Sequence, residues 1–310
     1  MVVSSLSDPV SGLSPTHDTG GARGKRRATL IGFSAVLMWA LLAVLTIGST
    51  PVPPFQLNAI CFAIGGAIGL IWMARGAGFS ALRGVRWTVY VAGTLGLFGY
   101  HFLYFTAIRM APYAETGLIA YLWPLFIVLL SGLLPGERLR AMHVVGAVVA
   151  FAGAALILMR GGAGWQPGAG LGMALAFVCA VTWAVYSVAS RRFGAVPSEA
   201  VTVYCLATAV LSLIAHIVLE TTVWPADPVG WLSVALLGLG PVGLAFFTWD
   251  VGMKRGDIQI LGVASYAAPL LSTLALILSG RAVATPMLVL SAILITGGAA
   301  LAARASLSKP

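Results

Sequence analysis

The sequence is poor in charge, and above all in acidic residues. Only 9% of its 310 residues are charged, with nine Asp and Glu against eighteen Lys and Arg. A soluble domain carries about a quarter charged residues, which it needs to cover a surface that faces water. Since 59% of the residues are apolar, most of the outside of this chain must face lipid instead. The low charge therefore excludes an ordinary soluble protein.

Several further absences exclude classes of function. The sequence contains neither the GxxxxGK[ST] loop that binds ATP phosphates nor the HExxH pair that binds a catalytic zinc ion. Its three cysteines, Cys61, Cys179 and Cys205, all lie inside apolar runs, with no spacing typical of a disulfide framework or a zinc site. No Lys or Arg lies in the middle of an apolar run, which argues against a fixed cationic site for phosphates. We therefore expect no enzymatic activity, no cofactor and no metal.

What the sequence does contain is a series of ten apolar stretches, each long enough to cross a membrane as a helix. They cover residues 28–48, 55–74, 86–108, 112–133, 142–159, 169–191, 198–219, 229–251, 258–279 and 284–303. The expected fold is therefore an all-α membrane protein with ten transmembrane helices.

The positions of the basic residues set the orientation of these spans. The net charge of +9 does not indicate nucleic-acid binding, because the basic residues form short clusters between the apolar stretches. With the N-terminus in the cytoplasm, all of the basic residues fall inside except Arg109, Arg160 and Arg281. The positive-inside rule then predicts that both termini are cytoplasmic.

The segment before the first span is rich in Ser, Gly, Pro and Thr and ends in the basic run Arg23 to Arg27. This composition predicts a disordered basic tail over residues 1–27. The apolar run that follows is about twenty residues long, without a small-residue cleavage site, and is therefore expected to be a retained helix rather than a signal peptide. A second short tail is expected at residues 304–310.

The sequence also repeats itself after about 144 residues, so that one five-helix repeat covers residues 28–160 and a second covers 169–303. The clearest matches are Trp39-Ala40 with Trp183-Ala184, and Tyr121-x-x-Pro124-Leu125 with Tyr266-x-x-Pro269-Leu270. Because five is an odd number, the second repeat enters the membrane inverted. Inverted repeats are a recurrent transporter design, in which the substrate site lies near the midplane between the two halves.

These features together resemble the drug/metabolite transporter superfamily, in particular its EamA-type members, and most of all the YddG-type exporters of aromatic amino acids. The resemblance covers nearly all of residues 28–303, and it includes Gly136-Glu137 just after the fourth span. It implies that spans five and ten lie away from the cavity. One departure is that Gly136-Glu137 corresponds to Gly280-Arg281 in the second repeat. The lost acidic residue argues against a mechanism with a symmetric pair of carboxylates.

Two prolines, Pro124 and Pro269, lie at equivalent places inside spans four and nine. Proline removes a backbone donor and frees carbonyl groups, and in a membrane such groups persist only where protein or a watery cavity satisfies them. Both helices are therefore predicted to line the central cavity, with the prolines as a hinge or gate. A kink that serves packing alone is the alternative.

Ten ring-bearing side chains are the predicted substrate-binding residues. Tyr hydroxyl and Trp indole N–H groups need partners away from water, and aromatic rings also attract an ammonium group. Ordinary packing explains any one of them equally well, but the set favours a cavity for a substrate. The residues are Trp39, Tyr100, His101, Tyr104, Tyr121, Trp123, Trp183, Tyr186, Trp249 and Tyr266.

Two ionisable residues in or near spans are of interest. His101 lies well inside a span, where it could bind a substrate carboxylate, carry a proton, or be a neutral histidine hydrogen-bonded within the bundle. Asp250 lies near the end of span eight, four residues before Lys254. We favour an ion pair between these two over a protonation role for Asp250.

The sequence thus predicts a secondary transporter that exports amino acids, aromatic or other large neutral ones, and related small metabolites. One half is expected to rock against the other in alternating access. The expected partners are the lipid bilayer and a small-molecule substrate, with the chain as a monomer or weak homodimer in a bacterial inner membrane. The alternatives are an exporter of a drug or a nucleotide-sugar, and a channel, although no filter loop is present.

Overall fold

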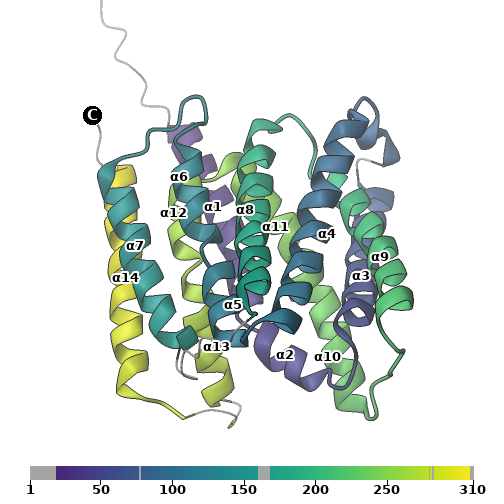
Figure 1. Cartoon of the computed structure of the whole chain (residues 1–310). Coiled ribbons are helices and arrows are strands. Elements are labelled where there is room, and N and C mark those ends of the chain that lie inside the picture. The colour runs from purple at the N-terminus through teal and green to yellow at the C-terminus, as the bar shows by residue number, and fades with distance from the viewer. Residues whose placement is uncertain (1–18, 77, 160–167, 279, 281–282, 308–310) are drawn as a thin grey trace, which may run out of the picture.

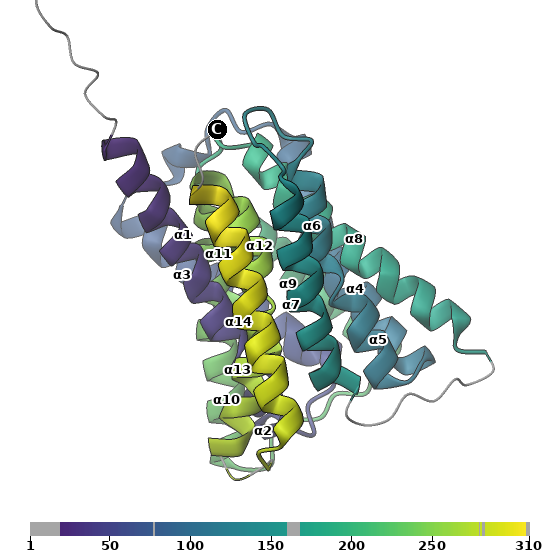
Figure 2. The ribbon, with the colours of Figure 1, turned by 90° about the vertical axis from the view of Figure 1, so that its left-hand side faces the viewer.

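The protein is a bundle of helices that run between two opposite ends (Figure 1). The computed structural model describes residues 19–76, 78–159, 168–278, 280 and 283–307, and within these ranges the regular structure is helical, with no strand. The all-α prediction is confirmed. The first described helix begins, and the last ends, at the same end of the bundle (Figures 1 and 2), which we call the terminal end.

The elements follow one another in a simple order. They are α1 (Thr19–Trp39), α2 (Leu42–Gly48), α3 (Pro54–Arg75), η1 (Phe79–Leu82), α4 (Trp87–Met110), α5 (Tyr113–Ala120), α6 (Trp123–Ser131), α7 (Ala141–Leu158), α8 (Gly170–Arg192), α9 (Ala200–Leu219), α10 (Pro228–Leu239), η3 (Gly240–Leu244), α11 (Ala245–Arg255), α12 (Ile258–Ala264), α13 (Ala267–Leu278) and α14 (Pro286–Leu307).

Eight helical stretches are long and apolar enough to cross a membrane, judged by their length and composition. Two shorter apolar helices, Thr116–Ser131 and Ala141–Leu156, fall where spans four and five are predicted. The ten predicted spans therefore coincide with these ten segments, and that all ten cross a membrane stays a prediction. Predicted features at residues 1–18, Arg160, Arg281 and 308–310 lie outside the described residues.

The N-terminal helix is longer than the apolar pattern predicts. Helix α1 begins at Thr19, so residues 19–27, which were expected to belong to a disordered tail, are helical. Lys and Arg are good helix formers, and the apolar turns that follow extend the helix through them. The Lys25 ammonium also forms an ion pair of 2.9 Å with Asp257, at the start of α12. This contact anchors the basic turn at the terminal end.

Spans four and nine each break just before their proline. The fourth span divides into α5 and α6 at residues 121–122, and the ninth into α12 and α13 at residues 265–266. A proline ring clashes with the carbonyl group four residues earlier, which for Pro124 is that of Ala120, the last residue of α5. Span eight contains a different irregularity, the single π-helical turn η3, whose second residue is Pro241.

Helices from the two repeats pair with each other throughout the bundle. Helix α1 packs along α11 and, at the equivalent place in the repeat, α4 packs along α8. The remaining two close pairs are α3 with α9 and α7 with α14. The halves therefore interleave and are not two separately packed bodies. This packing argues against the expectation that one half rocks against the other as a rigid unit.

Glycine allows these pairs to approach closely, as small residues do between membrane helices. A Cβ atom at Gly32 of α1 would lie 2.7 Å from the Cα of Gly252 in α11, and one at Gly65 of α3 would lie 2.9 Å from the Cα of Gly243. In α14, a Cβ atom at Gly298 would lie 2.9 Å from the Cβ of Ala150 in α7. Glycines in spans two, five and ten thus lie directly against helices of the other repeat.

Two adjacent glycines in α14 give a direct test of this packing. We expect Gly298→Ala to destabilise the protein by roughly 1–3 kcal/mol, because the new methyl group overpacks the contact with Ala150. Gly297→Ala is the control, since a Cβ atom there meets nothing within 4 Å and alanine favours the helix. The measurement is the melting temperature in detergent. Equal melting temperatures for the two variants would contradict the close α7–α14 contact.

Candidate functional site

Four tryptophans from four different helices meet at the centre of the bundle. Trp39 ends α1, Trp123 begins α6, and Trp183 and Trp249 lie inside α8 and α11. The ring centroid of Trp39 lies 5.0 Å from that of Trp249, 5.8 Å from that of Trp183 and 6.1 Å from that of Trp123. Aromatic rings favour such edge-on and tilted arrangements at this spacing. We call these four rings the tryptophan cluster.

The tryptophan cluster is packed rather than open. Trp123, Trp183 and Trp249 are each 5% exposed or less, and Trp39 is half-buried. The indole N–H of Trp39 donates to the carbonyl of Pro241 at 3.0 Å, and that of Trp249 donates to the Ser187 hydroxyl at 3.1 Å. Buried indole groups need such partners, and here both are supplied by other helices.

A second group of rings, on α4, lies beside the tryptophan cluster and is more open. Tyr100, His101 and Tyr104 are all half-buried. The Tyr100 ring lies 5.2 Å from Trp183 and stacks on Tyr104 at 6.2 Å, with the two planes 3° apart. The Nδ1 atom of His101 lies 2.7 Å from the Leu97 carbonyl. Because a carbonyl only accepts, Nδ1 donates this bond, which leaves Nε2 as the nitrogen that can meet a substrate.

Nine of the ten predicted site residues form one connected set of rings. Tyr121 lies 6.4 Å from Trp123, and Tyr186 lies 5.3 Å from Trp183. The tenth, Tyr266, does not join this set. It is fully buried against Phe151, and its hydroxyl accepts a hydrogen bond of 3.0 Å from the backbone N–H of Leu125. Tyr266 thus provides a hydrogen-bond acceptor for a backbone N–H group in the first turn of α6, which follows the break in span four.

The structure adds apolar rings that the sequence did not single out. Phe246 stacks on Phe62 at 5.2 Å and lies 5.8 Å from Trp183, while Phe62 also contacts His101 at 5.1 Å. Phe246 precedes Trp249 by three residues, so both side chains lie on the same face of α11. The position of Trp249 in the sequence could therefore have pointed to Phe246. Pro241, whose carbonyl accepts from Trp39, was also missed. A proline inside an apolar run is the signal that could have found it.

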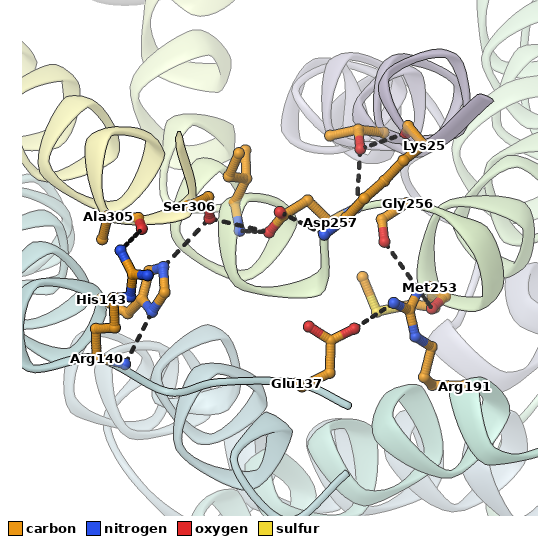
Figure 3. Close-up of polar contacts among 12 residues, drawn as sticks. Lys25, Glu137, Arg140, His143, Arg191, Met253, Gly256, Asp257, Ala305 and Ser306 are labelled. Atoms are coloured by element: carbon orange, nitrogen blue, oxygen red, sulfur yellow. Dashed lines mark hydrogen bonds and ion pairs between the residues drawn. The ribbon is translucent and has the colours of Figure 1, made fainter. Parts of the chain in front are cut away.

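The terminal end of the bundle holds a polar network centred on Arg191 (Figure 3). The guanidinium of Arg191, at the end of α8, forms an ion pair with Glu137. It also donates to the backbone carbonyls of Met253, Lys254 and Gly256 at 3.2, 3.1 and 2.8 Å. We call this the Arg191 network. It joins the loop after α6 to the end of α11, so it bridges segments of both repeats.

A buried ion pair lies near the Arg191 network. The Nζ atom of Lys254 lies 2.7 Å from the Asp250 carboxylate and donates to the carbonyl of Val196 at 2.9 Å. The same carboxylate accepts from the Ser198 hydroxyl at 2.6 Å. The predicted pair between Asp250 and Lys254 is therefore confirmed, and it ties α11 to the loop between α8 and α9.

The opposite end of the bundle holds a cluster around Glu220, just after α9. Its carboxylate accepts the backbone N–H groups of Phe55 and Gln56, both at the start of α3, at 3.0 and 3.1 Å. Arg109 and His216 complete its partners at 2.5 and 3.0 Å. Burial raises the pKa of Glu220, but these hydrogen bonds outweigh burial and hold the pKa below its usual value. Glu220 therefore caps α3 as a carboxylate.

Charge is thus concentrated at the two ends, while the central rings are uncharged. Among the described residues, no group of three or more His, Cys, Asp or Glu side chains could hold a metal ion. Cys61, Cys179 and Cys205 are free and buried. An uncharged aromatic centre suits a small amphipathic molecule with an aromatic or aliphatic side chain.

Comparison with known proteins identifies relatives over nearly the whole chain. The model of the EamA-like transporter family matches residues 26–159 and again residues 170–304. The chain is 55% identical, over 89% of its length and 96% of the relative, to the aromatic amino acid exporter YddG of Ancylobacter novellus. It is 28% identical to the exporter of the same name from Salmonella typhimurium, over 80% of this chain and 87% of that protein.

Comparison with solved structures also finds a close relative. One crystal structure superposes with a TM-score of 0.87 at 53% identity, and the match covers 91% of this chain and 99% of the other. Likeness of this degree extends to the packing of helices as well as to their order.

The Glu220 cluster leads to a prediction about pH. Since its folded pKa lies below the unfolded value, the stabilisation is fully present above the unfolded pKa and is lost as the pH falls through the folded pKa. We expect Glu220→Gln to lower the free energy of unfolding at neutral pH by roughly 2 kcal/mol and to flatten the loss of stability toward pH 4. Melting temperatures from pH 7 to pH 4 provide the measurement. Glu199→Gln is the control, because the Glu199 side chain caps nothing. A parallel pH profile for Glu220→Gln and the unmodified protein would be contrary evidence.

Proposed function

Because the chain belongs to the EamA-like transporter family, we propose that it is a secondary transporter that exports aromatic amino acids across a bacterial inner membrane. The observation that carries this proposal is the tryptophan cluster with its half-buried neighbours Tyr100, His101 and Tyr104. The names of the relatives support the substrate class. Both termini lie in the cytoplasm, in keeping with the excess of basic residues at the terminal end.

The rings explain how such a site recognises its substrate. An aromatic side chain gains from stacking and edge contacts with Tyr100, Tyr104 and Trp183, each of which is worth about 0.5–1.5 kcal/mol beyond burial. The ammonium group of the amino acid is attracted to the same ring faces. With its proton on Nδ1, neutral His101 has an acceptor at Nε2, which can receive a hydrogen bond from the ammonium group of the amino acid. An amino acid carries no net charge at neutral pH, so a site without fixed charges suits it.

Export by alternating access requires that each end of the bundle open in turn. In the conformation described, the Arg191 network joins Glu137 to the end of α11 at the terminal end. The guanidinium holds the carbonyls that end α11 and the Glu137 carboxylate at once, so opening this end breaks several charge-assisted bonds together. The proline breaks in spans four and nine provide places where the helices can bend during this change. We assign the Arg191 network as the cytoplasmic gate.

The substrate assignment is tested by efflux from liposomes loaded with labelled phenylalanine or tryptophan. We expect saturable efflux, and a half-saturation concentration roughly threefold to tenfold higher for Trp183→Ala, because the substrate loses one ring contact. Trp87→Ala is the control, since Trp87 is 73% exposed and lies outside the cluster. Trp183→Phe should retain most of the affinity. If a folded protein moves no amino acid at all, the substrate assignment fails and only the transporter family remains.

The gate is tested by amide hydrogen exchange. We expect Arg191→Gln and Glu137→Gln to increase exchange in the loops at residues 134–140 and 254–258, because the shared ion pair and the bonds to the carbonyls are lost. Phenylalanine efflux should slow in the same variants as the closed state becomes less populated. Arg138→Gln is the matched control, since Arg138 is exposed next to Glu137. Unchanged exchange in Arg191→Gln would rule out the gate while leaving the substrate assignment intact.

A further inference from the structure

A cavity lies outside the aromatic centre, between α4 and α8 in the half of the bundle nearest the terminal end. It encloses about 400 Å³, within the size range of sites for small molecules. Its walls are apolar, with Val89 and Ala92 from α4 and Val181 and Val185 from α8. The two helices stand side by side at the front of Figure 1. Of the predicted site residues it includes only Tyr186, so it is a separate feature.

Small residues on α4 create this space, and its mouth faces outward. Gly93 and Gly96 leave room for the rings of Tyr204 and Tyr186, which lie against the α4 backbone where a side chain would otherwise project. Leu95 and Val185 at the rim are 59% and 50% exposed. In a protein that spans a membrane, such an apolar rim borders the hydrocarbon of the lipid. Whatever fills the cavity therefore enters from the bilayer.

The floor of the cavity is polar, unlike its rim. Tyr186 and Tyr204, which are 8% and 4% exposed, both line this floor. Ser190 and the Asp250–Lys254 pair also line the floor. A tyrosine hydroxyl that lines a cavity can donate a hydrogen bond to a ligand inside it, so two tyrosines at one floor favour a ligand with acceptor oxygens. The ligand must be amphipathic, with an apolar part at the rim and acceptor oxygens at the floor.

The charges around the mouth identify the headgroup of this ligand. Arg86 immediately precedes α4, Arg192 ends α8, and both are exposed at the terminal end beside the cavity. Arginines between helices on the basic side of a membrane protein favour anionic lipid headgroups. We propose that the cavity holds one acyl chain of an anionic phospholipid from the cytoplasmic leaflet. Its ester oxygens accept from Tyr186 and Tyr204, and its phosphate lies at Arg86 and Arg192.

This lipid site has a consequence for the aromatic centre. Tyr186 has its ring 5.3 Å from Trp183, so a chain that occupies the cavity packs behind the tryptophan cluster. It also lies between α4 and α8, which come from different repeats. The proposal does not depend on which substrate is exported, because it rests on the bilayer alone.

Native mass spectrometry of the full chain tests the site directly. The purified protein is released from nanodiscs of equal parts palmitoyl-oleoyl phosphatidylglycerol and palmitoyl-oleoyl phosphatidylcholine, and retained lipids are counted. We expect one phosphatidylglycerol per chain. Ala92→Phe and Ala189→Phe, which fill the cavity, should weaken retention at least roughly tenfold, because each methylene kept out of the cavity costs about a factor of four. Val91→Phe, at an exposed neighbouring position outside the cavity, is the control.

A second pair of substitutions separates the chain from the headgroup. Arg86→Gln with Arg192→Gln should keep a bound lipid but reduce the preference for phosphatidylglycerol by roughly fivefold per arginine. Melting curves confirm that each variant is folded. Retention by Ala92→Phe equal to that of Val91→Phe would overturn the proposal. So would displacement of the lipid by phenylalanine in solution, which would make the cavity a substrate site instead.

Discussion

The irregular helices of this bundle depend on one constraint, which is that a peptide group without a helical partner inside a membrane must find another donor or acceptor. At two irregular places, aromatic side chains from the opposite repeat bond to the backbone. Trp39 donates to the carbonyl of Pro241 in the π-helical turn, and the hydroxyl of Tyr266 accepts from the N–H of Leu125 after the break in span four. Each bond crosses between the repeats. The bent places of one half are therefore held by rings of the other.

The contacts between the two repeats also determine which parts of the molecule can move together. Helix α1 packs on α11 and α4 on α8, with glycine at several of the closest contacts, so a separation of residues 28–160 from 169–303 would break most of the helix packing. In the alternating access proposed above, the groups of helices that move against each other therefore each contain helices of both repeats. The Arg191 network, which joins the loop after α6 to the end of α11, lies where such mixed groups meet at the terminal end.

Much of this architecture could be predicted from the sequence, because apolar length, the basic loops and the repeat are strong signals in a membrane protein. The Asp250–Lys254 pair follows from spacing along one helix. Tyr266 lies apart from the other nine predicted rings, and nothing in the sequence indicated this, since a mid-span tyrosine gives the same pattern whether it faces a cavity or a neighbouring backbone. Phe62 and Phe246 lack the polar atoms that marked other rings, and the capping of α3 by Glu220 joins residues 165 apart in sequence. Contacts between residues so far apart produce no pattern in the local sequence.

The tryptophan cluster also gives the protein an internal optical reporter. Four indoles whose ring centroids lie 5.0–6.3 Å from at least one other are close enough to exchange excitation energy, so light absorbed by one emerges from whichever has the lowest-energy surroundings. They come from α1, α6, α8 and α11, so any rearrangement of these helices alters the emission of the whole group. Five further tryptophans outside the cluster also emit, so the part of the intrinsic fluorescence that reports the centre is the difference between the protein and a variant without a cluster tryptophan.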